Sequence, residues 1–317
     1  MEISFSPNPD RPALVIGGAG VDIVGRLRSE LRSRTSNPAL FRTSFGGVAR
    51  NVAENLARMG QAVTLITAVG ADQTGEQLLE QTAEPGVDVS QVMRTDAYPT
   101  GMYVGVVEKS GALQIALDDM RVISTLNSAY LRDRAALFEQ ASLVFVDANL
   151  PKETLRTVVS LTRRAGLPLC ADPTSTTLAD RLRPYLSRLK LISPNSAEAA
   201  VLMDQPFDAT KSSQAIQAAK YLVGQGVEIC VITMAEFGVV YATSETSGRV
   251  PAVRTEILDP TGAGDALTAT LLYALLNEIP LDDAVALGAS AATLTLRHPG
   301  SVLPDLTLEM LYDHLVI

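Results

Sequence analysis

The sequence is poor in the residues on which several kinds of functional site depend. In 317 residues it has no tryptophan, two cysteines and two histidines. Few residues are therefore available for a zinc site or a Ser-His-Asp triad. No disulfide framework is indicated, which suits a reducing cytosol. Cys170 and Cys230 each lie in an apolar run, so we expect both to be buried in strands.

Positive charge and long apolar segments are also scarce. The 26 lysines and arginines are outnumbered by 35 aspartates and glutamates, which gives a net charge of −9 and argues against binding nucleic acid through a general basic surface. No apolar run is long enough to span a membrane. The amino-terminal segment lacks the basic stretch and apolar core of a signal peptide. We therefore expect a cytoplasmic protein with no membrane or nucleic-acid partner.

Apolar strands and amphipathic helices alternate over nearly the whole chain. Helical segments separate the strand-like runs, which include 13–25, 62–72, 142–150 and 167–175. This alternation predicts an α/β fold in which helices cover both faces of a mainly parallel central sheet. We expect a single domain over residues 1–317.

Two segments interrupt the alternation. Residues 98–120 contain two strand-like stretches around Lys109-Ser110-Gly111, which is a hairpin signal. We predict that about 24–45 and 98–120 form a small β-sheet lid inserted in the α/β core. Asp118 and Asp119 would be solvated residues of this lid, or one of them would reach the ligand. The alternating faces of the hairpin suit pairing across a two-fold axis, so a homodimer through the lid is expected.

The segment DPTGAGDAL at 259–267 carries the clearest chemical signal. Glycines allow the backbone to turn tightly and to approach a ligand closely, and the first N–H groups of a helix have no intrahelical partner. Gly262, Ala263 and Gly264 are therefore predicted to form an anion hole. The Asp265 carboxylate beside it could take a proton from an attacking hydroxyl. The alternative is that Asp265 only complements the helix dipole.

Glycines near the amino terminus mark a second ligand-binding region. The run Gly17, Gly18, Gly20 does not complete GxGxxG because Ile23 stands at the third position, which disfavours a NAD-dependent dehydrogenase. Asp22 follows an apolar run directly, so we expect it at the carboxyl end of a sheet strand, facing a ligand crevice. The alternative is a solvated Asp in a turn.

A Gly-Gly turn opens the helical segment at 45–60. Gly46 and Gly47 precede it, and Asn51 lies in its first turns, where close approach of a ligand is again favoured. The alternative for Asn51 is a solvated position near the helix cap. An anion hole, a neighbouring carboxylate and a lid together suit phosphoryl transfer from a nucleotide to a hydroxyl. The Walker and protein-kinase motifs are absent, so a different kinase architecture is required.

At these motifs the sequence resembles the ribokinase-like, or PfkB, family of carbohydrate and nucleoside kinases. DPTGAGDAL resembles the C-terminal signature of the family, and GGVARNVAENLARMG (46–60) resembles the N-terminal one. PNSAE (194–198) is similar to its Asn-x-x-Glu element, and TMAEFGV (233–239) to its nucleotide-side turn, with Ala235 in place of a Gly. The resemblance covers nearly the whole chain and implies a three-layer αβα sandwich and an ATP-dependent kinase.

The resemblance also implies a role for each matched position. Asp265 would be the catalytic base beside the anion hole of Gly262, Ala263 and Gly264. The acceptor would be held by Asp22, Gly46, Gly47 and Asn51. The nucleotide would be lined by Asn195, Thr233 and Gly238. Glu198 would order Mg²⁺ through water, unless it only caps its helix, and Asp172 would touch the same water shell or cap the turn that follows it. Asp259 and Thr261 match positions that bind K⁺ in several members.

Within the family, several segments look like the pseudouridine kinase subgroup. They are RN and ENLA within 50–57, TGMY (100–103), ALDDM (116–120) and ADPTS (171–175). Val48 stands where a ribokinase would carry Lys, and Gly20 where the family often has Asn. The implied acceptor is pseudouridine. The alternatives are a ribokinase, fructokinase, 2-keto-3-deoxygluconate kinase or other nucleoside kinase. A non-catalytic regulator that binds a sugar or nucleoside is the alternative from another class.

Overall fold

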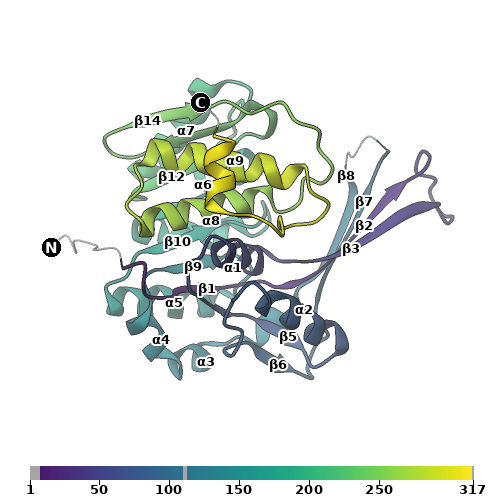
Figure 1. The fold of residues 1–317 in the computed structure, drawn as a ribbon, viewed down its shortest axis with the longest axis horizontal. Helices are drawn as coiled ribbons and strands as arrows, with labels where there is room; N and C mark the ends of the chain where they lie inside the picture. Colours follow the sequence, from purple (N-terminus) through teal and green to yellow (C-terminus); the bar gives the residue numbers. More distant parts are fainter. Residues whose placement is uncertain (1–7, 110–112, 316–317) are drawn as a thin grey trace.

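A central sheet of eight strands organises the computed structural model, which describes residues 8–109 and 113–315 (Figure 1). In spatial order the strands are β14 (Ser247–Val250), β13 (Val239–Ala242), β12 (Ile229–Thr233), β11 (Leu191–Ile192), β10 (Leu169–Asp172), β9 (Val144–Asp147), β1 (Ala13–Ile16) and β4 (Val63–Ile66). The pairs from β4 to β12 are parallel, whereas β13 and β14 are antiparallel at one edge. The predicted α/β fold with a mainly parallel sheet is confirmed.

Successive strand residues enter two different cores, because side chains alternate between the faces of a sheet. Leu14 and Val144 pack on one face. The helices on that face are α3 (Ser128–Arg132), α4 (Ala135–Gln140), α5 (Lys152–Ala165), α6 (Ser196–Met203) and α7 (Ser212–Gly224). Ala13 and Phe145 pack on the other face. The helices there are α1 (Val48–Arg58), α8 (Ala263–Leu276), α9 (Leu281–Leu296) and α10 (Leu308–Asp313). These are the three layers expected.

A second, four-stranded sheet projects from the body of the molecule (Figure 1). Its order is β3 (Ala39–Gly46), β2 (Gly20–Leu27), β7 (Gly101–Val107) and β8 (Leu113–Asp119). The run at 13–25 was expected to be one strand, and that prediction is wrong. β1 ends at Ile16 in the central sheet, and β2 begins at Gly20 in the second sheet. The strands β7 and β8 pair as expected for a hairpin, and residues 110–112 of its predicted turn lie outside the described residues.

The remaining elements connect these layers. They are β5 (Ala68–Gly70), α2 (Gln73–Ala83), β6 (Met93–Thr95) and the 3₁₀ turns η1 (Arg121–Thr125), η2 (Ala179–Arg181), η3 (Arg183–Arg188) and η4 (Ala235–Phe237). The segment between β10 and β11 contains the two short 3₁₀ turns η2 and η3 in place of an α-helix, with Pro184 at the start of the second. Cys170 and Cys230 are buried in β10 and β12, as predicted. Among the described residues, no helix has the length and apolar character needed to cross a membrane.

Candidate active site

Two helices that are distant in the sequence pack against each other, and each begins at a glycine. α1 follows Gly47, whose φ is 98°, and α8 follows Gly262, whose φ is 79°. A Cβ on Gly262 would lie 1.8 Å from the carbonyl oxygen of Ser301, and one on Gly47 would lie 2.6 Å from that of Gly18. Both the left-handed backbone and the lack of space therefore require glycine.

The side chain of Asn51 joins the two helix starts. Its Nδ2 donates a hydrogen bond of 2.7 Å to Oδ2 of Asp265. Its Oδ1 accepts from Arg50 Nη1 at 3.2 Å and from Ser301 Oγ at 3.1 Å. Because the oxygen faces these donors, the amide is oriented with its N–H toward the carboxylate. Asn51 is only 2% exposed, so the alternative of a solvated residue near the cap is wrong.

A buried ion pair supports this amide from the same helix. Arg50 bonds to Glu54 one turn later, and both side chains are almost fully buried. Arg50 also donates to the carbonyl oxygen of Phe45 at 3.1 Å, which fixes the chain just before the Gly-Gly turn. Sequence reasoning named Arg50 but gave it no role. The i, i+4 spacing of opposite charges on an apolar helix was the available signal.

Asp265 lies in the first turn of α8 and is half-buried. Burial raises the pKa of its carboxyl to about 7, the hydrogen bond from Asn51 lowers it, and the charges of Asp22, Asp147 and Glu198 raise it. A general base works best when its pKa lies near the working pH. The geometry brings this carboxylate to the start of α8, where helix N–H groups lack intrahelical partners.

Asp22 was expected at the carboxyl end of a strand of the central sheet, and that prediction is wrong. It lies within β2, where it is paired with Ser44 on one side and Tyr103 on the other. The apolar run misled the prediction because it continues through the change of sheet. The carboxylate covers Gly46, whose Cβ would lie 2.0 Å from Asp22 Oδ2. Burial raises the pKa of Asp22 to about 6, while Arg50 lowers it and Asp259 raises it.

Asp147 is a buried part of the site to which sequence reasoning gave no role. Its Oδ2 accepts from the backbone N–H of Gly18 at 2.8 Å and of Ala49 at 3.0 Å. It thus joins the end of β9 to the loop after β1 and to the first turn of α1. Gly17 needs to be glycine because its Cβ would lie 2.4 Å from this carboxyl group. Burial raises the pKa of Asp147. An Asp directly after an apolar strand was the available signal.

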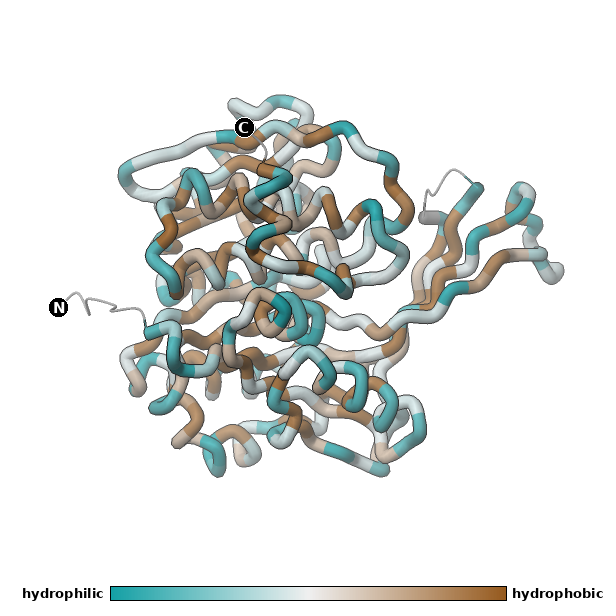
Figure 2. Tube along the Cα trace, viewed as in Figure 1, coloured by the Kyte–Doolittle hydropathy of each residue, from teal (hydrophilic) through white to brown (hydrophobic). Residues whose placement is uncertain are grey.

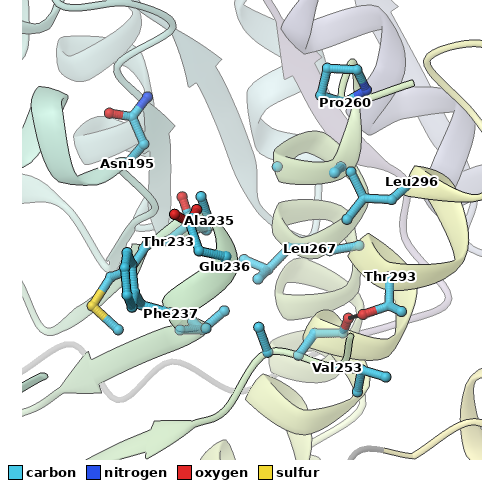
Figure 3. A pocket seen from close by; sticks show the side chains of 18 of the residues that line it. Asn195, Thr233, Ala235, Glu236, Phe237, Val253, Pro260, Leu267, Thr293 and Leu296 are labelled. Atoms are coloured by element: carbon cyan, nitrogen blue, oxygen red, sulfur yellow. Dashed lines mark hydrogen bonds between the residues drawn. The ribbon is translucent and has the colours of Figure 1, made fainter. Parts of the chain in front are cut away.

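A cavity of about 960 Å³ opens beside the start of α8 (Figure 3). Asn195, Thr233 and Gly238 line one side of it, and Ala263 and Gly264 line the end nearest Asp265. Its walls are mainly apolar, with Phe237, Val253, Leu267 and Leu296 among them. The predicted nucleotide residues and two of the three predicted anion-hole residues therefore line one cavity.

The turn after β12 has a strained residue in this cavity wall. Ala235 has φ 48°, a left-handed conformation that disfavours a residue with a Cβ. It stands where the family usually has Gly. Gly238 has φ 93°, and a Cβ there would lie 2.2 Å from the carbonyl oxygen of Val250. The two positions together fold the turn tightly against β14.

Glu198 and Asp172 form an acidic cluster near Asp265. Asn195 and Glu198 make a capping box at the start of α6, in which Glu198 accepts from the Asn195 N–H at 2.8 Å. Asp172 accepts from the Thr174 N–H at 2.7 Å. Both capping roles that were considered are therefore present. Burial raises the pKa of Asp172 well above its usual value, and the neighbouring Glu198 and Asp265 raise it further. Burial also raises the pKa of Glu198.

Asp259 lies before the predicted anion hole and is buried. Its Oδ1 accepts from the Thr261 N–H at 3.0 Å, and its Oδ2 accepts from the Gly300 N–H at 3.2 Å. Arg42, from β3 of the second sheet, forms an ion pair with the same Oδ2. Of the two aspartates at the end of β8, Asp119 pairs with Arg121 at 2.6 Å, and Asp118 is exposed beside Tyr103.

A family model described as pfkB family carbohydrate kinase matches residues 13–307. The members of this family are phosphotransferases, and the chain belongs to it. The expected family and enzyme class are therefore confirmed.

Two curated relatives cover nearly the whole chain. Pseudouridine kinase of Escherichia coli (strain K12) is 29% identical over 298 residues, which are 93% of this chain and 93% of the relative. Guanosine-inosine kinase of Exiguobacterium acetylicum is 30% identical over 280 residues, which are 88% and 92% of the two chains. Among solved structures, Arabidopsis thaliana ribokinase in complex with ribose and ATP has a TM-score of 0.82 at 21% identity. It covers 95% of this chain and 98% of its own, which confirms the ribokinase-like fold.

Proposed function

We propose that the protein transfers the γ-phosphate of ATP to a primary hydroxyl of a sugar or nucleoside, and that the acceptor is pseudouridine. The observation that carries this proposal is the position of Asp265. Its carboxyl has a pKa of about 7, is held by Asn51 and directly follows Ala263 and Gly264, which line the cavity. The proposed base and the proposed anion-binding helix start therefore lie side by side.

The proposed reaction is a direct in-line transfer. The acceptor hydroxyl gives its proton to Asp265 as its oxygen attacks the γ-phosphorus, and the bond to the β-phosphate oxygen breaks to release ADP. For pseudouridine the attacking group is the 5′-hydroxyl, and the product is pseudouridine 5′-phosphate. Negative charge on the transferring phosphoryl group would be stabilised by the N–H groups of Gly262, Ala263 and Gly264 at the positive end of α8.

The two substrates would enter from opposite sides of Asp265. ATP would lie in the cavity, with its base against apolar walls and its phosphates toward Gly264, past Asn195, Thr233 and Gly238. The acceptor would be held beside the Gly46-Gly47 turn by Asp22 and Asn51, whose side chains lie against Gly46 and Asp265 respectively. We propose that the second sheet is a lid over this side, formed by about 24–45 and 98–120, and that it excludes water during transfer.

The acidic cluster beside the anion hole suits a divalent cation. Burial raises the pKa of both carboxyls, and the charge of Glu198 raises that of Asp172 further, which a cation would relieve. Within the described residues, no group of three or more ligating side chains is arranged to hold a metal alone. Mg²⁺ usually keeps several waters and shares one or two carboxylates with substrate phosphates. We propose that Glu198 and Asp172 hold Mg²⁺ through water, where it would neutralise phosphate charge.

The choice of pseudouridine rests on resemblance within the family. The relative named pseudouridine kinase is matched over 93% of this chain, and the second relative is named for two other nucleosides. Both names favour a nucleoside over a free sugar. Ribose, fructose and 2-keto-3-deoxygluconate remain the alternative acceptors. A non-catalytic regulator is disfavoured, because the base and the anion-hole glycines are all present.

An ADP-release assay with a panel of acceptors tests the proposal. Pseudouridine, uridine, guanosine, inosine, adenosine, ribose, fructose and 2-keto-3-deoxygluconate would each be supplied with MgATP. We expect the highest kcat/KM with pseudouridine. Activity on a free sugar but not on pseudouridine would reject the acceptor while leaving the kinase intact. Absence of transfer to every acceptor, with ATP still bound, would favour the regulator.

We also propose that the protein is cytoplasmic and forms a homodimer through the second sheet. Arg42 and Asp22 lie on one face of this sheet, so the strand alternation puts Phe41 and Leu117 on the opposite face. These apolar side chains are 71% and 62% exposed, and Figure 2 shows apolar segments along the projecting strands. Exposed apolar patches of this kind mark interaction surfaces.

A further inference from the structure

The Arg42 guanidinium crosses from the second sheet to the loop at 259–264. It forms an ion pair with Asp259, whose side chain is 4% exposed, while that of Arg42 is 36% exposed. A buried carboxylate needs a compensating charge. Arg42 provides that charge from a strand 217 residues away in the sequence.

Asp259 in turn holds the shape of the anion hole. Its two oxygens accept from the N–H groups of Thr261 and Gly300, so the carboxylate joins the start of the loop to the segment after α9. Gly262 then packs against the Ser301 carbonyl, with no room for a Cβ. The position of the anion hole therefore depends on Asp259, and the charge of Asp259 is balanced by Arg42.

A monovalent cation does not fit this carboxylate as it stands. Oδ2 already accepts from the Gly300 N–H and pairs with Arg42, so a K⁺ ion on this oxygen would lie against the positive guanidinium, which repels it. We propose that Arg42 is the built-in cation of the anion-hole loop. In this chain it takes the place of the K⁺ expected at Asp259, so nucleotide binding needs no added monovalent cation. This inference rests on the proposed kinase function, and Arg42 acts as a positioning residue.

The ion pair also connects the two halves of the site. β3 carries Arg42 and continues directly to Gly46, over which Asp22 lies. Arg26 of the neighbouring strand β2 adds a hydrogen bond of 3.4 Å to the Leu258 carbonyl oxygen. A movement of the second sheet would therefore displace Arg42 and Arg26 and so change the position of the anion-hole loop.

Nucleotide binding in different salts tests the inference without any acceptor. The Kd for ADP with Mg²⁺ and the melting temperature would be measured in KCl and in tetramethylammonium chloride at equal ionic strength. We expect the native protein to give the same values in both salts, within about twofold in Kd. Arg42→Ala should bind ADP about tenfold more weakly in tetramethylammonium, as expected for a buried carboxylate that loses its partner, and K⁺ should restore binding.

Two further variants make the test specific. Arg42→Lys keeps the charge and should remain independent of K⁺. Arg28→Ala removes an exposed charge just past β2 and should change neither value. Dependence of the native protein on K⁺ would overturn the inference, as would normal binding by Arg42→Ala in tetramethylammonium or a loss that K⁺ does not restore. If pseudouridine is not the acceptor, these binding results are unaffected, so the two failures can be distinguished.

Discussion

Asn51 donates a hydrogen bond to Asp265 across 214 residues of sequence, and this bond joins the start of α1 to the start of α8. The donor favours the ionised carboxylate, whereas burial and the neighbouring acids favour the protonated form. The balance leaves the Asp265 pKa at about 7, where a carboxylate can accept a proton and return it.

Replacement of Asp265 by Asn should remove catalysis and keep nucleotide binding. The amide has the same shape but cannot take the acceptor proton, so kcat should fall by about 10²–10⁴-fold. The Kd for ADP with Mg²⁺, measured by calorimetry, should change by less than about threefold because the helix N–H groups remain. Near-normal turnover by this variant would reject Asp265 as the base.

The pH dependence of kcat/KM should report the ionisation of Asp265. The ionised carboxylate is the active form, so kcat/KM should rise with pH and level off above about 7. Asn51→Ala removes the donor that stabilises the ionised form, which raises the pKa and moves the rising limb to higher pH.

Ser301→Ala is the matched control for this shift. Ser301 donates to Asn51 but is not bonded to Asp265, and Arg50 would still orient the amide. The rising limb of the kcat/KM pH profile should therefore move less in Ser301→Ala than in Asn51→Ala. An unchanged limb in Asn51→Ala, measured over pH 5 to 9, would show that another group controls the profile.

Gly262→Ala should disrupt the anion hole, whereas Gly264→Ala should leave the fold unchanged. A Cβ at Gly262 would lie 1.8 Å from the Ser301 carbonyl oxygen, at a φ of 79°. Nothing lies within 4 Å of a Cβ at Gly264, which is helical. Steric conflict with backbone should lower the free energy of unfolding by about 2–4 kcal/mol in the first variant. Urea denaturation of both variants measures the difference, and equal stabilities would contradict it.

Phe41→Glu should weaken self-association through the second sheet. Phe41 is apolar and exposed on the face opposite Arg42, and a buried charge at a dimer interface is costly. Leu40→Glu is the matched control, because Leu40 is exposed on the other face of the same strand. Sedimentation velocity should show a dimer for the native protein and the control, and a monomer for Phe41→Glu. A native protein that is monomeric at micromolar concentration would reject the dimer.

Part of this site could be predicted from short-range sequence patterns. The glycines before α1 and α8 and the capping box at Asn195 are short-range features, because the residues that satisfy each helix start are adjacent in the chain. Alternating strands and helices also determine the layers of the fold. The glycine turns before these helices and the central sheet could therefore be predicted from the sequence, whereas the anion hole itself stays a prediction.

Long-range partners could not be predicted in this way. Asp147 accepts from the N–H of Gly18, which is 129 residues away, and Arg42 meets Asp259 across 217. No local sequence pattern predicts either contact, since each depends on how the sheets and helices pack. Asp22 was misplaced for a related reason. The apolar character of 13–25 continues while the chain leaves one sheet and enters another.

The packing of α1 on α8 makes the candidate site depend on a segment that is synthesised late. A nascent chain that ends before residue 259 already contains Gly46, Gly47 and Asn51, but it has neither the anion hole nor Asp265. The surface of α1 that α8 covers would remain exposed until the last sixth of the chain, roughly, has emerged. Truncated products should therefore be inactive and prone to aggregation, and phosphoryl transfer reports that the whole chain has folded.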